Sequence, residues 1–243
     1  FHLGNSILGY GMSLASNAGV GPIQQKRTIA VMGDGGFWHN GVQTGVATAL
    51  HNKSDGVLVI MQNGYASATG QQWLPSSGKY TPQAERGMDI ERHLSGMGVT
   101  WLKTVRTYSV SKVVAALKEA LTTTEKGLKV IIAESECMLA RKRRENAEDA
   151  RRQKEGRRVE KARFGVDDNI CTGDHSCICM SGCPSLTVKP NPDPLRSDPV
   201  AHVDNGCVAC GLCGEMAHAA ILCPSFYRAQ RTINAGWWER TLH

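Results

Sequence analysis

The sequence predicts an α/β fold with a doubly wound parallel sheet in its first 140 residues, followed by a small cysteine-rich region. Two observations predict this. Up to residue 140, short apolar runs alternate with segments of helical periodicity, as in parallel strands joined by helices. From residue 166 onward Cys, Gly and Pro dominate, and eight of the nine cysteines lie between residues 171 and 223. A segment this small buries little apolar surface and needs staples, which the cysteines can supply.

The elements follow from these patterns in order. The apolar runs predict strands at 28–32, 57–62, 101–108 and 128–135, since buried parallel strands are continuously apolar. Apolar stripes at helical spacing predict helices at 41–52, 89–98 and 109–124. Residues 141–163 carry dense charge and few apolar residues, which indicates either an exposed helix or a mobile linker, with the helix favoured. In such a sheet the ligand site lies at the carboxyl ends of the strands.

Composition and charge exclude several classes of protein. The 243 residues are 41% hydrophobic and 21% charged, which is ordinary for a globular protein, and no apolar run approaches the ~20 residues of a membrane span. The net charge of +6 is local, because residues 141–163 hold 11 basic and 5 acidic side chains. This pattern, without interleaved aromatic residues, argues against nucleic-acid binding. The chain starts at Phe1 without a signal-peptide pattern, so we expect a piece of a longer or processed polypeptide in a reducing cytoplasm, with cysteines that bind metal.

Polar residues follow two of the predicted strands. Gly33-Asp34-Gly35-Gly36 ends the first strand and Asn63 ends the next, with 28 residues between Asp34 and Asn63. Parallel neighbours would bring both side chains to one edge of the sheet. A carboxylate, an amide oxygen and a loop carbonyl suit Mg²⁺, and the glycines let backbone N–H groups approach a diphosphate. A Gly-Asp-Gly in an ordinary turn is the alternative interpretation.

The cysteines form two clusters, each ending in Cys-Pro-Ser. The second cluster, Cys207-x2-Cys210-x2-Cys213 with a remote Cys223-Pro224, has the spacing that wraps an iron–sulfur cubane. A zinc site or structural thiols are the alternatives, although zinc gives no reason for the Cys-Pro endings. Cys137 closes a predicted strand and reads as a buried small hydrophobe.

Together these motifs resemble the 2-oxoacid:ferredoxin oxidoreductases, most nearly the indolepyruvate ferredoxin oxidoreductase branch. The resemblance rests on GDGGFWHNGVQTG, on VIMQNGYASATGQQ and on the cysteine tail, over roughly residues 1–225. It implies a thiamine-diphosphate-binding fold followed by a ferredoxin-like domain with two [4Fe–4S] clusters. The implied division is a thiamine diphosphate domain (1–140), a charged linker (141–165), a cluster domain (166–230) and a tail (231–243). In the tail we expect Trp237 and Trp238 to pack on a partner.

The resemblance also implies site residues. Asp34, Asn63 and the Tyr65 carbonyl would bind Mg²⁺, and His39 would assist catalysis or lie in a supporting layer. The residues implied to bind thiamine diphosphate are Gly4, Asn5, Ser6, Gly33, Asp34, Gly35, Gly36, Asn63, Tyr65 and Thr69. The cluster ligands implied by two-cluster ferredoxins are Cys183, Cys207, Cys210 and Cys213 for one cluster and Cys171, Cys177, Cys179 and Cys223 for the other. The first motif is irregular (Cys171-x5-Cys177-x-Cys179-x3-Cys183), and nine residues separate Cys213 from Cys223. The ligand set of Cys171, Cys177, Cys179 and Cys223 is therefore the weaker of the two assignments.

The implied activity is oxidative decarboxylation of a 2-oxoacid, with an arylpyruvate such as indolepyruvate or phenylpyruvate favoured. Coenzyme A would take the acyl group, and electrons would leave through the clusters to ferredoxin or a flavoprotein. A pyrimidine-binding domain with its activating carboxylate is missing, so we expect further domains or a gamma-type subunit, and no nucleic-acid or membrane partner. The alternatives are a non-oxidative thiamine decarboxylase and an electron-transfer subunit without thiamine chemistry of its own.

Overall fold

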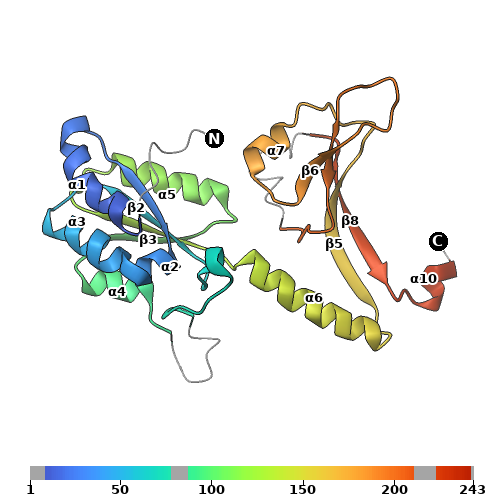
Figure 1. Cartoon of the computed structure of the whole chain (residues 1–243), viewed down its shortest axis with the longest axis horizontal. Helices are drawn as coiled ribbons and strands as arrows, with labels where there is room; N and C mark the ends of the chain where they lie inside the picture. Colours follow the sequence, from blue (N-terminus) through green and yellow to red (C-terminus); the bar gives the residue numbers. More distant parts are fainter. Residues whose placement is uncertain (1–8, 78–86, 211–222, 242–243) are drawn as a thin grey trace. The chain divides into compact units, whose positions relative to one another are not determined.

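A computed structural model of the chain describes residues 9–77, 87–210 and 223–241. They divide into two compact units, with the boundary between Cys137 and Met138, close to the expected boundary after residue 140. Figure 1 labels many of the elements of each unit. Among the described residues, no helix has the length and apolar character that crossing a membrane requires.

The first unit is an α/β unit with a four-stranded sheet in the order β1-β2-β4-β3, in which every neighbouring pair is parallel. This confirms the predicted α/β class and parallel sheet. The elements are α1 (Met12–Gln24), β1 (Ile29–Gly33), α2 (Asp34–Gly36), the π-helix η1 (Phe37–Ala47), α3 (Thr48–His51), β2 (Val57–Gln62), the 3-10 helix η2 (Ser67–Thr69), α4 (Ile90–Gly96), β3 (Trp101–Arg106), α5 (Val110–Thr122) and β4 (Lys129–Glu134).

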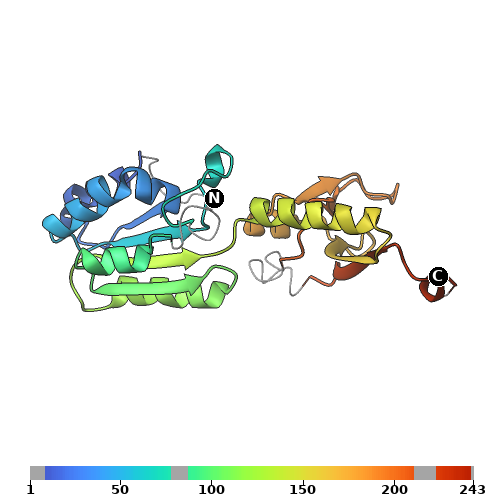
Figure 2. The same cartoon turned by 90° about the horizontal axis from the view of Figure 1, so that it is seen from below.

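Each face of this sheet has its own apolar core. On one face, alternate strand residues such as Ile60 and Ile132 pack with Leu14, Phe37 and Leu94 from the helices α1, η1 and α4. On the other face Val57 and Ile131 pack against α5. Figure 2 shows α5 on the opposite side of the sheet from α1. Side chains that alternate in direction along each strand therefore explain why the strands are apolar throughout.

The helical run after β1 differs from the expected helix at 41–52. It begins at Asp34, immediately after the strand, and continues through α2, η1 and α3 to His51. Its middle part has the wide turns of a π-helix, which are frequent at functional sites. Here a Cβ on Gly41 would come within 2.7 Å of the Met32 Sδ and 3.0 Å of the Gly36 carbonyl oxygen. The close approach of this helix to β1 therefore depends on glycine.

The second unit contains two small antiparallel sheets. β5 (Val159–Val166) pairs with β8 (Phe226–Ile233), and β6 (Leu186–Lys189) pairs with β7 (Val200–Val203). The remaining described elements are α6 (Met138–Lys154), α7 (Ser176–Ser181) and α10 (Trp237–Thr241). A small core of Leu186, Val200 and Val203 includes Cys171 and Cys177. The cysteines therefore take positions that larger hydrophobic side chains fill in other domains.

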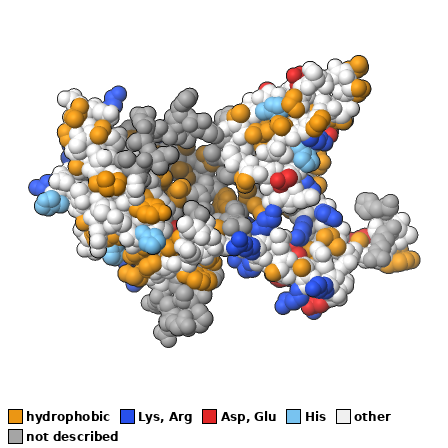
Figure 3. All heavy atoms as spheres, in the orientation of Figure 1, with side chains coloured by type: hydrophobic (Ala, Val, Ile, Leu, Met, Phe, Trp, Pro, Cys, Tyr) orange, Lys and Arg blue, Asp and Glu red, His pale blue; other side chains and the backbone are white. Residues whose placement is uncertain are grey.

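The charged segment is partly a helix and partly a strand. α6 agrees with the favoured helical interpretation, but residues 159–165, which we expected within the linker, belong to β5. Figure 3 shows Lys and Arg side chains gathered over α6. Several are paired four residues apart, as in Arg141–Glu145 and Arg152–Glu148, both at 2.6 Å. Such pairs support an exposed helix that buries little of its own surface. The pairing of β5 with β8 was not visible locally, because 59 residues separate Val166 from Phe226.

Candidate functional site

The centre of the first site is Asp34, which follows the end of β1. Gly33 lies beside Met61 in the parallel register of β1 and β2, so the residues after both strands meet at one sheet edge. The Asp34 carboxylate accepts three backbone hydrogen bonds. Oδ1 accepts from Gly35 N at 2.9 Å, and Oδ2 accepts from Asn63 N at 2.9 Å and from Gly64 N at 2.7 Å. The structure therefore brings Asp34 and Asn63 together across the two strand ends.

The environment of Asp34 suits a bound cation. Its side chain is buried, with 1% exposed, and it forms no ion pair with any described residue. Burial raises the pKa of Asp34, although the three backbone hydrogen bonds lower it in part. The nearby Asn63 Oδ1 accepts from Tyr65 N at 3.0 Å and keeps a second lone pair. One carboxylate, one amide oxygen and carbonyl oxygens form the hard donor set that Mg²⁺ requires.

The loop after Asn63 is held by short-range polar contacts. Ala66 pairs with Gln72 as an isolated bridge. The buried Ser77 hydroxyl donates to the Gly64 carbonyl and accepts from Leu74 N. Ser77 was not among the predicted site residues. A small hydroxyl residue in a Gly/Ser/Pro-rich stretch carries little signal, because its role depends on how the loop folds back.

The other predicted residues of this site lie at varied positions. His39 is exposed, and its ring stacks with Tyr10 at 6.2 Å between centroids. Thr69 Oγ1 donates to Gln72 Oε1 at 2.9 Å within the loop. Gly35 and Gly36 lie in tight space, since a Cβ on Gly36 would come within 2.8 Å of Tyr10. The predicted residues 4–6 lie outside the described residues.

A second site is formed by cysteines of the second unit. Cys171, Cys177 and Cys223 line one cavity of about 260 Å³. Burial raises the pKa of the Cys177 thiol, and the neighbouring Cys171 and Cys223 raise it further. Cys223 Sγ also lies 2.9 Å from Ser225 Oγ. Cys179 is exposed and does not line this cavity, so the structure brings together three of the four residues in this predicted set.

A second group of thiols surrounds Cys183. Burial raises the pKa of Cys183, and the nearby Cys210 and Cys207 contribute in the same direction. Cys207 Sγ accepts from Ala209 N at 3.4 Å and from Phe164 N at 3.5 Å. The fourth residue of this predicted set, Cys213, lies outside the described residues. Cys137 is buried, as expected, and accepts from Ser67 Oγ at 3.4 Å.

These arrangements differ from a site for one metal ion. Within the described ranges, no three His, Cys, Asp or Glu side chains are arranged to hold a single ion. A magnesium site with one carboxylate and several amide or carbonyl oxygens does not need such a trio. A cubane binds each thiolate to a separate iron, so its ligands need not converge on one point.

Comparison with known families decides the identity of the first unit. Residues 1–133 match the family described as "Thiamine pyrophosphate enzyme, C-terminal TPP binding domain". This chain belongs to the thiamine pyrophosphate enzymes. The matched range contains Asp34, Asn63 and the loop between β2 and α4, so the edge described above is in the part that binds thiamine diphosphate (thiamine pyrophosphate) in this family.

Relatives extend the similarity into the second unit. "Indolepyruvate oxidoreductase subunit IorA" of Pyrococcus horikoshii is 27% identical over 221 residues, covering 88% of this chain and 32% of the relative. The protein of the same name from Archaeoglobus fulgidus is 28% identical over 207 residues, covering 85% and 30%. These matches confirm the resemblance to the indolepyruvate branch. The chain spans about a third of the length of the curated relatives it matches.

Solved structures of thiamine pyrophosphate enzymes are also similar to this chain. The 2-oxoglutarate:ferredoxin oxidoreductase of Magnetococcus marinus is 18% identical to this chain, with a TM-score of 0.44. The match covers 53% of this chain and 46% of that protein's chain. The thiamine diphosphate-dependent 4-hydroxybenzoylformate decarboxylase of Rhodococcus jostii is 22% identical, with a TM-score of 0.32. That match covers 45% of this chain and 20% of the decarboxylase chain.

Proposed function

We propose that this chain is the thiamine diphosphate- and cluster-binding part of a 2-oxoacid oxidoreductase that acts on an arylpyruvate such as indolepyruvate. Coenzyme A receives the acyl group, and ferredoxin or a flavoprotein receives the electrons. The observation that carries the proposal is the buried Asp34 carboxylate beside Asn63, in a chain whose second unit contains two separate groups of cysteines. The name of the relatives supports the substrate class.

In this proposal the first unit holds the cofactor and the second holds the electron carriers. Asp34, Asn63 and the Tyr65 carbonyl bind Mg²⁺, and the backbone N–H groups of Gly35 and Gly36 approach the diphosphate. Gly33, Thr69 and residues 4–6 complete that site. Bound thiamine diphosphate supplies the electron sink for loss of CO₂ from the 2-oxoacid. His39, exposed beside Tyr10, is available to donate a hydrogen bond to substrate.

The cysteines divide into two ligand sets for [4Fe–4S] clusters. The first set is Cys183, Cys207, Cys210 and Cys213. The second is Cys171, Cys177, Cys223 and Cys179. Clusters of this kind carry single electrons, which oxidative chemistry on a 2-oxoacid requires and a non-oxidative decarboxylase does not. The exposed Trp237 and Trp238, at 69% and 72% exposure, contact a partner subunit or domain, and a pyrimidine-binding domain supplies the carboxylate that activates the cofactor.

The test is anaerobic reduction of the clusters by substrate. The complex containing this chain is mixed with indolepyruvate, phenylpyruvate or pyruvate, with and without coenzyme A, and the visible absorbance of the iron–sulfur chromophore is followed. Bleaching that is fastest with an arylpyruvate supports the proposal, and the Asp34→Asn variant must then fail to bleach. No bleaching by any 2-oxoacid in an iron-replete preparation refutes it and favours an electron-transfer subunit. Decarboxylation by an iron-free preparation favours the non-oxidative decarboxylase.

A further inference from the structure

A large cavity lies at the edge of the first unit's sheet opposite to Asp34. Its volume is about 790 Å³, within the range of small-molecule binding sites. It is lined by the carboxyl end of α1, by the turn before β2 and by the segment between α5 and β4. These segments precede β1, β2 and β4, whereas Asp34 follows β1. At ~3.3 Å per residue, the strands separate the cavity from Asp34 by roughly 20 Å.

The cavity is strongly basic. Lys26, Arg27, Lys53 and Lys126 line it against a single carboxylate, Asp55. Lys26 and Lys53 are exposed and form no ion pair within the described ranges. The Lys126 side chain is 86% exposed and lies 3.7 Å from Asp55. Three flexible ammonium groups therefore surround the opening, and nothing in the described part of the cavity neutralises the first two.

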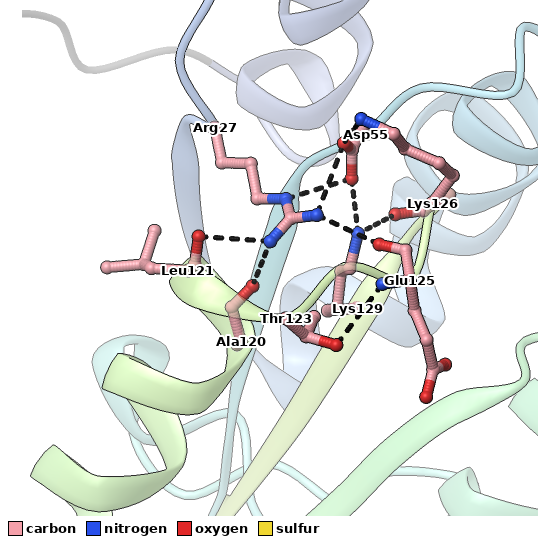
Figure 4. A network of polar contacts seen from close by, with 9 residues as sticks. Arg27, Asp55, Ala120, Leu121, Thr123, Glu125, Lys126 and Lys129 are labelled. Carbon is pink, nitrogen blue, oxygen red and sulfur yellow. Dashed lines mark hydrogen bonds and ion pairs between the residues drawn. The ribbon is translucent and has the colours of Figure 1, made fainter.

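The single carboxylate is already used inside the protein, as Figure 4 shows. Asp55 accepts from Arg27 Nε at 3.0 Å and from the ammonium group of Lys129, whose side chain is fully buried. Arg27 also donates to the carbonyl oxygens of Ala120, at 3.2 Å, and Leu121, at 3.0 Å. It thereby offsets the negative end of the α5 dipole, which would otherwise repel an anion. The Glu125 carboxylate points away from this network in Figure 4.

Two buried polar side chains at the cavity lack hydrogen-bond partners. The Nδ2 of Asn17 and the Oγ of Ser54 have none among the described residues, although the side chains are only 4% and 8% exposed. Both residues line the cavity. Asn17 packs so closely over Gly56 that a Cβ there would lie 1.8 Å from Nδ2. Buried groups without partners destabilise a fold, and both of these can donate hydrogen bonds to acceptor oxygens.

We propose that this cavity binds a small molecule carrying two or more phosphate groups, such as a nucleoside diphosphate. Lys26, Lys53 and Lys126 contact the phosphate oxygens as flexible point charges, and the Ser54 hydroxyl, which is buried in the free protein, turns toward the cavity to supply a neutral donor. The site lies at the other end of the strands from the thiamine site, so a ligand bound there leaves the thiamine site free.

Lysine footprinting tests this site independently of the proposed function. The purified protein is acylated in Mg²⁺-free buffer with and without ADP or inorganic pyrophosphate, and each lysine is quantified by mass spectrometry. Protection of Lys26, Lys53 and Lys126 by both probes, with Lys112 and Lys118 on α5 unaffected, supports the proposal. Protection by ADP alone assigns recognition to the nucleoside and overturns the phosphate-based site, as does the absence of protection by either probe.

Variants give a second readout by calorimetry with ADP on protein saturated with thiamine diphosphate. K26A/K53A should weaken ADP binding about tenfold, as expected when two solvent-screened contacts to phosphate are removed. The matched pair K112A/K118A should change it less than twofold. Ser54→Ala should weaken ADP binding without lowering the melting temperature of the free protein, because its hydroxyl has no partner to lose. Wild-type ADP affinity in K26A/K53A and in Ser54→Ala, as in the control pair, would overturn the proposal.

Discussion

Replacing Asp34 by Asn separates the stability of the free protein from its ability to bind cofactor. Asp34 is buried, and burial raises its pKa, so ionising this carboxylate in the free protein costs folding free energy. A raised pKa in the folded state gives stability that is present at low pH and is lost as the pH rises through that pKa. Asp34→Asn removes this charge, but its Nδ2 cannot accept a hydrogen bond, so at least one of the backbone N–H groups of Gly35, Asn63 and Gly64 loses its acceptor. The two changes oppose each other, and the cofactor-free variant should unfold at a free energy within about 1 kcal/mol of the wild type.

The cofactor should separate the two proteins. A ligand at one hundred times its Kd stabilises the folded state by about 2.7 kcal/mol. For a protein of this size that raises the melting temperature by roughly 8 °C, at roughly 3 °C per kcal/mol. The variant lacks the carboxylate that would bind Mg²⁺ beside Asn63. Its melting temperature should therefore rise by less than about 2 °C at the same concentrations of thiamine diphosphate and Mg²⁺.

Thermal unfolding followed by circular dichroism, with and without both cofactors, measures these shifts. The matched control is Glu125→Gln, an exposed acid in the same unit, which should behave like the wild type. As the pH falls through the raised pKa of Asp34, the cofactor-free wild type should approach the variant, because protonation removes the same buried charge. The reasoning is refuted if cofactors stabilise Asp34→Asn as much as the wild type, or if the cofactor-free variant is markedly less stable at neutral pH.

Three further predictions concern other parts of the chain. Asp55→Asn leaves the buried Lys129 without its counter-charge and should lower the free energy of unfolding by about 3 kcal/mol in urea titrations; a loss below about 1 kcal/mol would contradict this. Partial burial raises the pKa of Asp55, but hydrogen bonds from the cationic Lys129 and Arg27 outweigh it and keep that pKa below its usual value. The stability that ionised Asp55 gives the wild type should therefore be lost as the pH falls below about 4, and the variant should show no such loss. Cys177→Ser should reduce bound iron by about half relative to the wild type, whereas Cys137→Ser should not; equal iron in both variants would remove Cys177 from the ligand set. Gly41→Ala places a Cβ 2.7 Å from a methionine sulfur in β1 and should lower stability by about 2 kcal/mol, an expectation that unchanged unfolding would disprove.

Local sequence patterns predicted much of the structure of the first unit. The strands at 57–62 and 128–135 were placed within a residue or two because each is a continuous apolar run, which only a strand buried on both faces requires. Asp34 and Asn63 could be paired because their positions after successive parallel strands lead to one edge of the sheet. The start of the helix at Asp34 was missed, since glycines at 35, 36 and 41 lower local helix propensity. Only tertiary contacts explain these glycines, which face Ala66, Tyr10 and Met32 respectively.

The sequence by itself determined the parallel α/β sheet, the edge that carries Asp34 and Asn63, and the concentration of eight cysteines between residues 171 and 223. These depend on spacing and periodicity along the chain, which one strand or one turn expresses locally. Tertiary structure alone decided that Arg27, Asp55 and Lys129 meet, that Cys179 is exposed outside the cavity lined by Cys171, Cys177 and Cys223, and that β5 pairs with β8. Those contacts join residues tens of positions apart, and their free energy depends on burial and charge that no single segment contains.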